Sequence, residues 1–242
     1  VAVAAARVVA RLADEARAVG VEFRLGEPVR ELAMAGDRVI GVLTGAGALL
    51  EADSVVVAAG AWTPNLLPWL RGYLWTTSHP VLHFRPRAEV AERLAGLPTW
   101  SLEVAETGFY GFPLLPDGIL KVARHAEGIA GLGPSVRAPG VAVERAFRTF
   151  LDRHLPPVVQ GPRVGGRWCR YCDTLDGDFW IGRDPERPGL TVAAGGAGHG
   201  FKFAPLLGAL IADAVEGARH PRFGWRLDGA VGMEAARAPV PS

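Results

Sequence analysis

The chain has 242 residues, of which 49% are hydrophobic and 21% are charged, and its formal net charge at pH 7 is +1. This length can bury a large core in one domain or two smaller ones. The balanced charge gives no electrostatic reason to expect nucleic acid or an anionic membrane as a partner. No apolar run approaches the ~20 residues that cross a bilayer, so we expect no membrane-spanning segment.

Residues 1–20 have the apolar period of a helix, with Val8, Leu12 and Val19 on one stripe and Gly20 at the end. The sequence starts at Val1, and no N-capping residue precedes the helix. A complete chain rarely begins inside a helix. We therefore expect this sequence to be the C-terminal part of a longer protein.

The next segments predict the second half of an open α/β sheet. Residues 21–25 (VEFRL) indicate a strand, and residues 38–52 indicate a hairpin around a glycine turn. The continuous run SVVVAAGAW, residues 54–62, is apolar on both faces, which is typical of a strand inside a parallel sheet.

From residue 63 to about 167 the pattern changes to short strands and two helices, 88–96 and 141–154. This favours an antiparallel sheet with helices on one side. A strand at 190–195 and an apolar helix ending at Gly217 then return to the α/β layer. The predicted class is α/β, or mixed α+β. The expected domains are residues 1–62, 63–167, 168–225 and a tail at 226–242.

A glycine-rich turn lies between that last strand and helix, with Gly195, Gly196, Gly198 and Gly200 next to His199. Free N–H groups at a helix start suit an anion or an electron-rich heteroatom. Glycine for a tight turn alone is the alternative interpretation. Because four glycines stand beside His199 and Lys202, we favour binding.

The two cysteines, Cys169 and Cys172, form a CxxC sequence. So few cysteines exclude a disulfide framework and suit a reducing compartment, so we expect a cytoplasmic protein. The pair could be half a zinc site, a redox dithiol or two buried thiols. Zinc would need His79 and His83, about ninety positions away, so we predict no metal.

Lys121 stands in the apolar strand segment GILKVARH, four residues before His125. By strand alternation Lys121 shares a face with Ala123, opposite Leu120 and Val122. The alternation alone leaves open whether this face is a pocket or solvent.

Five segments, in this order, carry a resemblance over almost the whole chain: ADSVVVAAGAWTPNLLP, FYGFP, GILKVARH, CRYCDTLDGDFWI and GAGHGFKFAPLLG. They resemble the flavin-dependent amine oxidases of the D-amino-acid oxidase superfamily. The branch is that of monomeric sarcosine oxidase, N-methyltryptophan oxidase and pipecolate oxidase. The resemblance implies part of a Rossmann-like FAD-binding domain and a substrate domain with a mixed sheet.

The resemblance implies FAD, held in this branch by a thioether from a cysteine that matches Cys169. Cys172 stands where the family commonly has threonine. Lys121 matches the lysine that promotes reaction of the reduced flavin with oxygen. His125 matches the active-site histidine, and Lys202 matches a lysine near the flavin that holds the substrate carboxylate.

Further contacts are implied in the same way. Tyr110, together with Lys202, is expected to contact the substrate. The expected contacts with the cofactor come from Val29, Ala59, Gly60, Trp62, Gly196, Gly198, His199, Gly200 and Phe201.

The implied reaction is oxidation of a secondary amine or N-substituted amino acid. Hydride passes to flavin N5, water hydrolyses the imine, and O2 reoxidises the flavin to give H2O2. The expected partners are a small amine and O2, with a monomeric full-length enzyme. A cofactor-free relative that retains the fold is the alternative. An NAD-linked dehydrogenase lacks its pyrophosphate fingerprint in this sequence.

The absent fingerprint also predicts what precedes Val1 in the longer protein. We expect a strand, a GxGxxG turn and an acidic residue about twenty positions further on. We accordingly expect the 242-residue chain by itself to be inactive.

Overall fold

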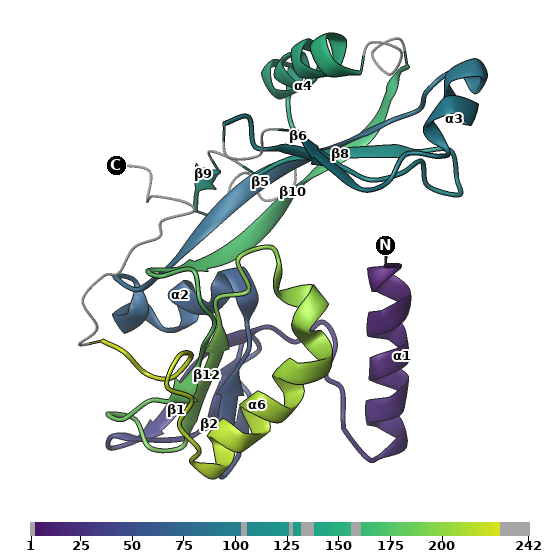
Figure 1. The fold of residues 1–242 in the computed structure, drawn as a ribbon. Helices are drawn as coiled ribbons and strands as arrows, with labels where there is room; N and C mark the ends of the chain where they lie inside the picture. The colour runs from purple at the N-terminus through teal and green to yellow at the C-terminus, as the bar shows by residue number, and fades with distance from the viewer. Residues whose placement is uncertain (1–2, 103–105, 126–127, 132–137, 156–160, 228–242) are drawn as a thin grey trace. The chain divides into compact units, whose positions relative to one another are not determined.

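A computed structural model describes residues 3–102, 106–125, 128–131, 138–155 and 161–227. The chain divides into two compact units (Figure 1). Thr77–Arg170 form the main part of one, here called the insert unit. Ala4–Thr76 and Tyr171–Ala236 form the other, here called the flanking unit. The domain bounds expected from the sequence remain a prediction.

The flanking unit contains two three-stranded sheets. In the first, β1, β2 and β3 pair in antiparallel order, and in the second the order is β11-β12-β4. Its elements are α1 (Ala5–Ala18), β1 (Val29–Ala35), β2 (Arg38–Thr44), β3 (Leu49–Glu51), β4 (Val55–Val57), η1 (Gly60–Trp62), α2 (Thr63–Leu66), η2 (Pro68–Leu70), β11 (Trp180–Arg183), β12 (Leu190–Ala194), η3 (Gly200–Phe203) and α6 (Ala204–Glu216). No helix in the described part of the chain is long and apolar enough to cross a membrane.

The predicted opening helix, hairpin and final apolar helix are confirmed as α1, β2–β3 and α6. The strand predicted at residues 21–25 is wrong, because those residues pair with no strand and Leu25 is 80% exposed. The prediction of a parallel strand at β4 is confirmed by its pairing with β12. Burial of β4 on both faces is wrong, because no described element covers Val56, which is 40% exposed.

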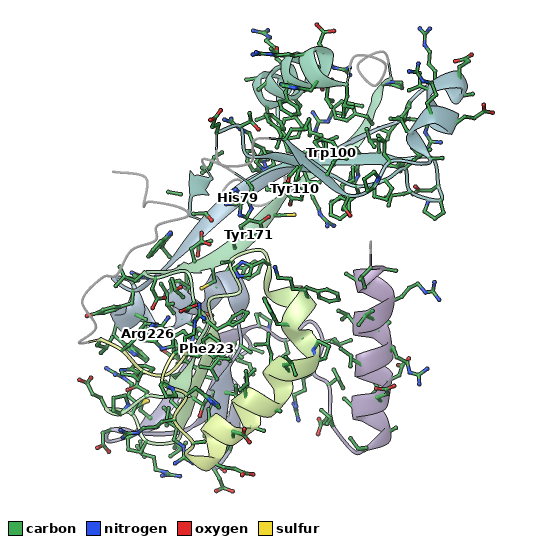
Figure 2. The ribbon with its side chains drawn as sticks, in the orientation of Figure 1. His79, Trp100, Tyr110, Tyr171, Phe223 and Arg226 are labelled. Carbon is green, nitrogen blue, oxygen red and sulfur yellow. The ribbon has the colours of Figure 1, made fainter. Side chains whose placement is uncertain are left out.

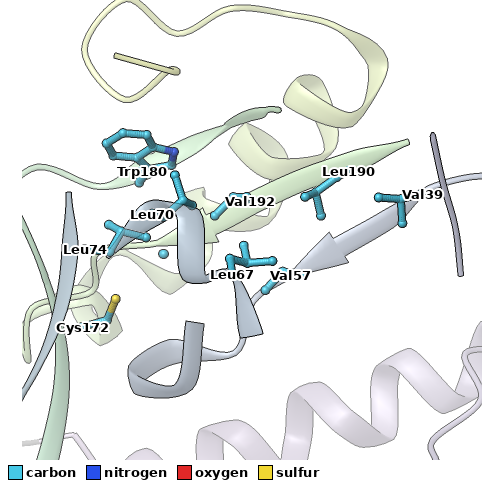
Figure 3. Close-up of a cluster of buried hydrophobic side chains, with 10 residues drawn as sticks. Val39, Val57, Leu67, Leu70, Leu74, Cys172, Trp180, Leu190 and Val192 are labelled. Carbon is cyan, nitrogen blue, oxygen red and sulfur yellow. The ribbon is translucent and has the colours of Figure 1, made fainter. Parts of the chain in front are cut away.

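The core of the flanking unit lies between the β11-β12-β4 sheet and the short helices α2 and η2 (Figure 3). Leu67, Leu70 and Leu74 are fully buried against it, together with Trp180 and Val192. Each such side chain contributes ~1.5–3 kcal/mol through burial. The chain on either side of the insert unit is thus held in one core.

The insert unit is a long antiparallel sheet with helices on one face, as predicted. The strand order is β10-β5-β8-β7-β6, and β9 pairs with β5. Its elements are β5 (Leu74–Phe84), α3 (Ala88–Leu94), β6 (Trp100–Leu102), β7 (Phe109–Gly111), β8 (Leu120–Arg124), β9 (Ile129–Ala130), α4 (Val141–His154) and β10 (Arg163–Thr174), of which β5 and β10 continue into the flanking unit.

Side chains on one face of this sheet form the second core. Leu82 and Phe84 of β5 and Leu120 and Val122 of β8 are fully buried. They pack with a set of helix residues, Leu94 from α3 and Phe147, Phe150 and Leu151 from α4. Because strand residues alternate, the intervening side chains of β5 and β8 point to the opposite face. We call that opposite side the polar face.

Two ion pairs fix the C-terminal segment of the flanking unit to the turn after β10. The Arg226 guanidinium bonds both carboxylate oxygens of Asp176, at 2.5 and 2.7 Å, and stacks 4.6 Å from the Trp180 ring centroid. Arg222 forms a similar pair with Asp178. The two pairs differ in exposure: the side chain of Arg226 is 17% exposed and that of Arg222 is 74% exposed.

We predict that the Asp176–Arg226 pair contributes more to stability than the Asp178–Arg222 pair. In double-mutant cycles with Asp176→Asn and Arg226→Gln, the coupling free energy at pH 7 should be about 1–3 kcal/mol. The matched cycle at Asp178 and Arg222 should give a clearly smaller coupling, because solvent screens the exposed Arg222 side chain. Urea unfolding measures both, and equal coupling energies would contradict the prediction.

The same pair predicts a pH dependence. Hydrogen bonds from Arg226 hold the pKa of Asp176 below its ordinary value of 3.8, against the opposing effect of burial. The coupling is therefore complete above that ordinary value and is lost as pH falls through the lowered pKa of the folded state. Repeating the Asp176 cycle at decreasing pH should show this decline.

Candidate functional site

The register of the insert sheet places Lys121 on the polar face. His83 lies directly opposite Lys121, and Val81 lies directly opposite Ala123. On the other side, Tyr110 of β7 pairs with Ala123. Cross-strand partners share a face, so β5, β7 and β8 contribute neighbouring side chains here. The register thus identifies the neighbours of Lys121, and its role in a site remains a prediction.

Lys121 is partly buried, and its Nζ lies 4.4 Å from the centroid of the Phe112 ring. Burial lowers the pKa of Lys121, as does the positive charge of Arg167, while Cys169 raises it. The Phe112 ring offers the ammonium group a cation–π contact in partial compensation for lost water. Lys121 is thus a partly desolvated cation, near a second cation and a thiol.

His125 follows β8 immediately, and its N–H donates to the carbonyl of Gly108 at 2.7 Å. Its ring lies between two aromatic neighbours. The Tyr110 ring meets it edge-on, with centroids 6.2 Å apart, and the His79 ring stacks on it at 5.6 Å. Figure 2 labels His79 and Tyr110. Tyr110 also lies 6.1 Å from the Phe112 ring that contacts Lys121. Contacts between neighbouring rings therefore link Lys121, through Phe112, to Tyr110 and His125 within the insert unit.

The two cysteines differ in environment. Cys169 is partly exposed, whereas Cys172 is buried, and both are free thiols. Burial raises the pKa of Cys172 to about 11. A thiol with so high a pKa stays protonated near neutral pH and is a poor nucleophile. Cys172 therefore fits the interpretation as a buried thiol. Among the described residues, no three His, Cys, Asp or Glu side chains are grouped to hold a metal.

The glycine loop of the flanking unit is held by its own backbone. The N–H of Ala197 donates to the carbonyl of Cys172 at 3.0 Å, and the N–H of Gly200 donates to that of Gly196 at 2.8 Å. His199 contacts the carbonyl of Ala197 through Nδ1 at 3.1 Å. Ala197 has a φ of 42°, which is uncommon for a residue with a side chain. These bonds set the loop in one conformation ahead of η3 and α6.

Close packing explains two of the glycines, whereas the binding interpretation remains a prediction. A Cβ at Gly198 would lie 2.4 Å from the ring of Tyr171, and the φ of Gly198 is +71°. A Cβ at Gly195, whose φ is +78°, would likewise lie 2.6 Å from the side chain of Thr174. A Cβ at Gly196 would meet nothing within 4 Å. Gly195 and Gly198 therefore serve close packing, whereas the packing of the described residues does not require glycine at position 196.

The other residues expected to contact the cofactor are found in the flanking unit. Gly60 begins η1 directly after β4, with a φ of +53° and open space beside it. Trp62 is 52% exposed, Phe201 is 40% exposed and Val29, at the start of β1, is 43% exposed. Ala59 is partly buried, and Lys202 is exposed, with its Nζ 5.2 Å from the Phe203 ring. Their roles remain predictions.

Sequence reasoning missed the position of His79, which it considered only as a zinc ligand. His79 is 1% exposed and belongs to the aromatic group around His125. The spacing of His79, Val81 and His83 does indicate a shared strand face. It does not indicate which residue of a distant strand meets that face.

The sequence profile of the FAD dependent oxidoreductases matches residues 1–214. The chain belongs to this family.

Relatives with sequence similarity are oxidases of N-methylated amino acids by name. Monomeric sarcosine oxidase from Streptomyces avermitilis is 35% identical over 67% of this chain and 44% of its own length. N-methyl-L-tryptophan oxidase from Citrobacter koseri is 32% identical over 72% of this chain and 46% of its own. The chain thus spans about half the length of the curated relatives that it matches.

Solved structures show the same fold. A fructosyl peptide oxidase thermally stable mutant superposes with a TM-score of 0.82 at 23% identity, over 95% of this chain and 59% of its own. The fructosyl amine:oxygen oxidoreductase Amadoriase I from Aspergillus fumigatus superposes with a TM-score of 0.72 at 26% identity. The match covers 88% of this chain and 56% of the Amadoriase I chain.

We predict that Gly198→Ala and Gly196→Ala differ in their effect on stability. Alanine at 198 combines a left-handed backbone with a clash against Tyr171, so it should destabilise the protein by about 2 kcal/mol or more. Alanine at 196 meets no atom, so it should change stability by less than ~1 kcal/mol. Urea unfolding of the two variants measures this, and equal losses would show that the loop is not packed on Tyr171.

Proposed function

We propose that the whole protein oxidises a secondary amine or an N-substituted amino acid, with FAD as cofactor and O2 as electron acceptor. The observation that carries this proposal is the group of Lys121, Tyr110 and His125 on the polar face of the insert sheet. The family and the names of the relatives support it. FAD, when bound, would supply the two-electron oxidation of the amine to an imine, with O2 as the final acceptor of the electrons and protons.

The residues of the flanking unit fit part of an FAD site. The open backbone at Gly60 and Gly196 would let a flat ligand approach closely, and the exposed rings of Trp62 and Phe201 offer apolar contact. N–H groups at the start of η3 and α6 suit the electron-rich edge of the ring system. We propose that these residues, with Val29, Ala59, Gly198, His199, Gly200 and Lys202, hold the cofactor.

We propose Cys169 as the covalent attachment point. It is the partly exposed thiol of the pair, and it lies near the ammonium group of Lys121. Cys172, buried and with a raised pKa, is unsuited to this reaction.

Lys121 acts electrostatically. A cation in a partly dry site stabilises the negative charge that oxygen gains as it accepts electrons. The residues that hold the substrate are Tyr110, from the aromatic group, and Lys202, whose exposed ammonium suits a carboxylate. His125 lies beside Tyr110. From there the imidazole of His125 can orient the substrate amine or exchange a proton with that amine.

The second candidate is a cofactor-free relative that retains the fold. The two candidates are separated by whether the purified whole protein is yellow, and whether the colour stays with it after acid precipitation. We expect a monomeric cytoplasmic enzyme, and we expect the 242-residue chain alone to bind little FAD and to be inactive.

Cys169→Ser should remove acid-stable colour, because serine oxygen does not replace the thiolate in the thioether. Cys172→Ser is the matched control, and its precipitate should stay yellow. Absorbance of the acid precipitate at the flavin maximum measures both. Colour that persists in Cys169→Ser would rule out attachment at this residue.

Lys121→Met keeps the length of the side chain and removes its charge. In the whole protein it should slow reoxidation of the reduced flavin by ~100-fold or more, by analogy with removal of an oxyanion-hole donor. Reduction by an amine such as sarcosine should change much less, because that step does not need the cation. Stopped-flow absorbance follows the two half-reactions separately. Equal small effects on both would place Lys121 outside the site.

A further inference from the structure

His79 is a buried histidine that the proposed reaction does not use. It lies on β5 of the insert unit, it is 1% exposed, and its ring stacks on that of His125 with an interplanar angle of 28°. A buried imidazole gives up water on both ring nitrogens, so burial without contacts would be costly. The surroundings of His79 therefore need an explanation.

Two neighbours restrict the ring of His79. The hydroxyl of Thr77, two residues earlier on the same strand face, lies 3.0 Å from Nε2. The backbone of Gly128 approaches the same edge, since a Cβ there would lie 2.7 Å from Nε2 and 2.8 Å from Cε1. A ring bonded on one edge and closely packed there has little freedom to rotate. His79 is thus a fixed plane.

The His79 ring covers one face of the His125 ring. The Tyr110 ring contacts the His125 ring in a T-shaped arrangement, with an interplanar angle of 83°. His125 directly follows the end of β8, and its backbone N–H donates to the carbonyl of Gly108. Stacking against a ring that does not rotate favours the side-chain rotamers of His125 that keep the two rings face to face.

We propose that His79 is a positioning residue: its ring, held by Thr77 and Gly128, fixes the plane of the His125 ring for the reaction. The expected effect on activity rests on the proposed function, whereas the orientation of the His125 ring by His79 does not. The stacking surface, rather than the ring nitrogens of His79, carries the effect. An aromatic ring without nitrogen should therefore replace His79, whereas a flexible amide should not.

Two variants separate the ring from the hydrogen bond. Thr77→Val with His79→Phe keeps a flat ring and removes both members of the hydrogen bond, so no buried hydroxyl loses its partner. His79→Gln keeps a hydrogen-bonding group for Thr77 and removes the ring. The control is His154→Gln, a histidine of the same unit that contacts Phe150, 4.6 Å away, in the core on the other face of the sheet.

In the whole protein, His79→Gln should lower kcat/KM for sarcosine, or for the best amine found, by ~10-fold or more. The double variant should stay within ~3-fold of the wild type, as should His154→Gln. A loss in the double variant as large as that in His79→Gln would overturn the proposal, because the ring would then not suffice. Unchanged activity in His79→Gln would overturn it as well.

A second measurement does not depend on activity. The ring ¹H–¹³C signal of His125 should be sharp in the wild type and in the double variant, and broadened by exchange or shifted in His79→Gln. If the whole protein oxidises no amine, the proposed function fails, and this signal alone decides the inference. A His125 signal that is the same in all three proteins would reject the positioning role even in an active enzyme.

Discussion

The strict two-residue alternation of the insert sheet is the constraint on which the site depends. Leu120 and Val122 of β8 are fully buried in the phenylalanine-rich core under α3 and α4. Lys121 must therefore face the other way, and the pairing with His83 sets its position along the strand. A register slip of one residue would place an ammonium group in that core, at a cost of several kcal/mol. Packing on one face thus specifies the chemistry on the other.

The flanking unit uses a different constraint, close approach of backbone to side chains. Gly195 and Gly198 lie against Thr174 and the ring of Tyr171, so the loop after β12 follows the surface of β10. The bond between Ala197 and Cys172 joins the same two segments. Cys172 is buried in this packing, and burial raises the pKa of its thiol to about 11, so the thiol stays protonated near neutral pH.

Much of this fold could be predicted from the sequence, because its local patterns are strong. The helix at 141–154 and the strand of Lys121 follow their apolar periods, and the hairpin follows its glycine turn. The failures have physical causes. The VEFRL segment has strand-forming residues but no partner strand among those described, and a strand exists only by pairing. The neighbours of His79 come from strand register and from a loop beyond β8, and such distant pairings leave no signal in one sequence.

On the polar face, a partly buried lysine has a cost in stability. Lys121 has a lowered pKa because water is partly removed and Arg167 repels it, so its charged form is less stable there than in solvent. The ring of Phe112 returns part of that energy. A methionine would fill this place with no such cost, so stability does not account for a lysine. We propose that the charge itself is what the reaction uses, because a partly desolvated cation acts strongly on any charge that develops beside it.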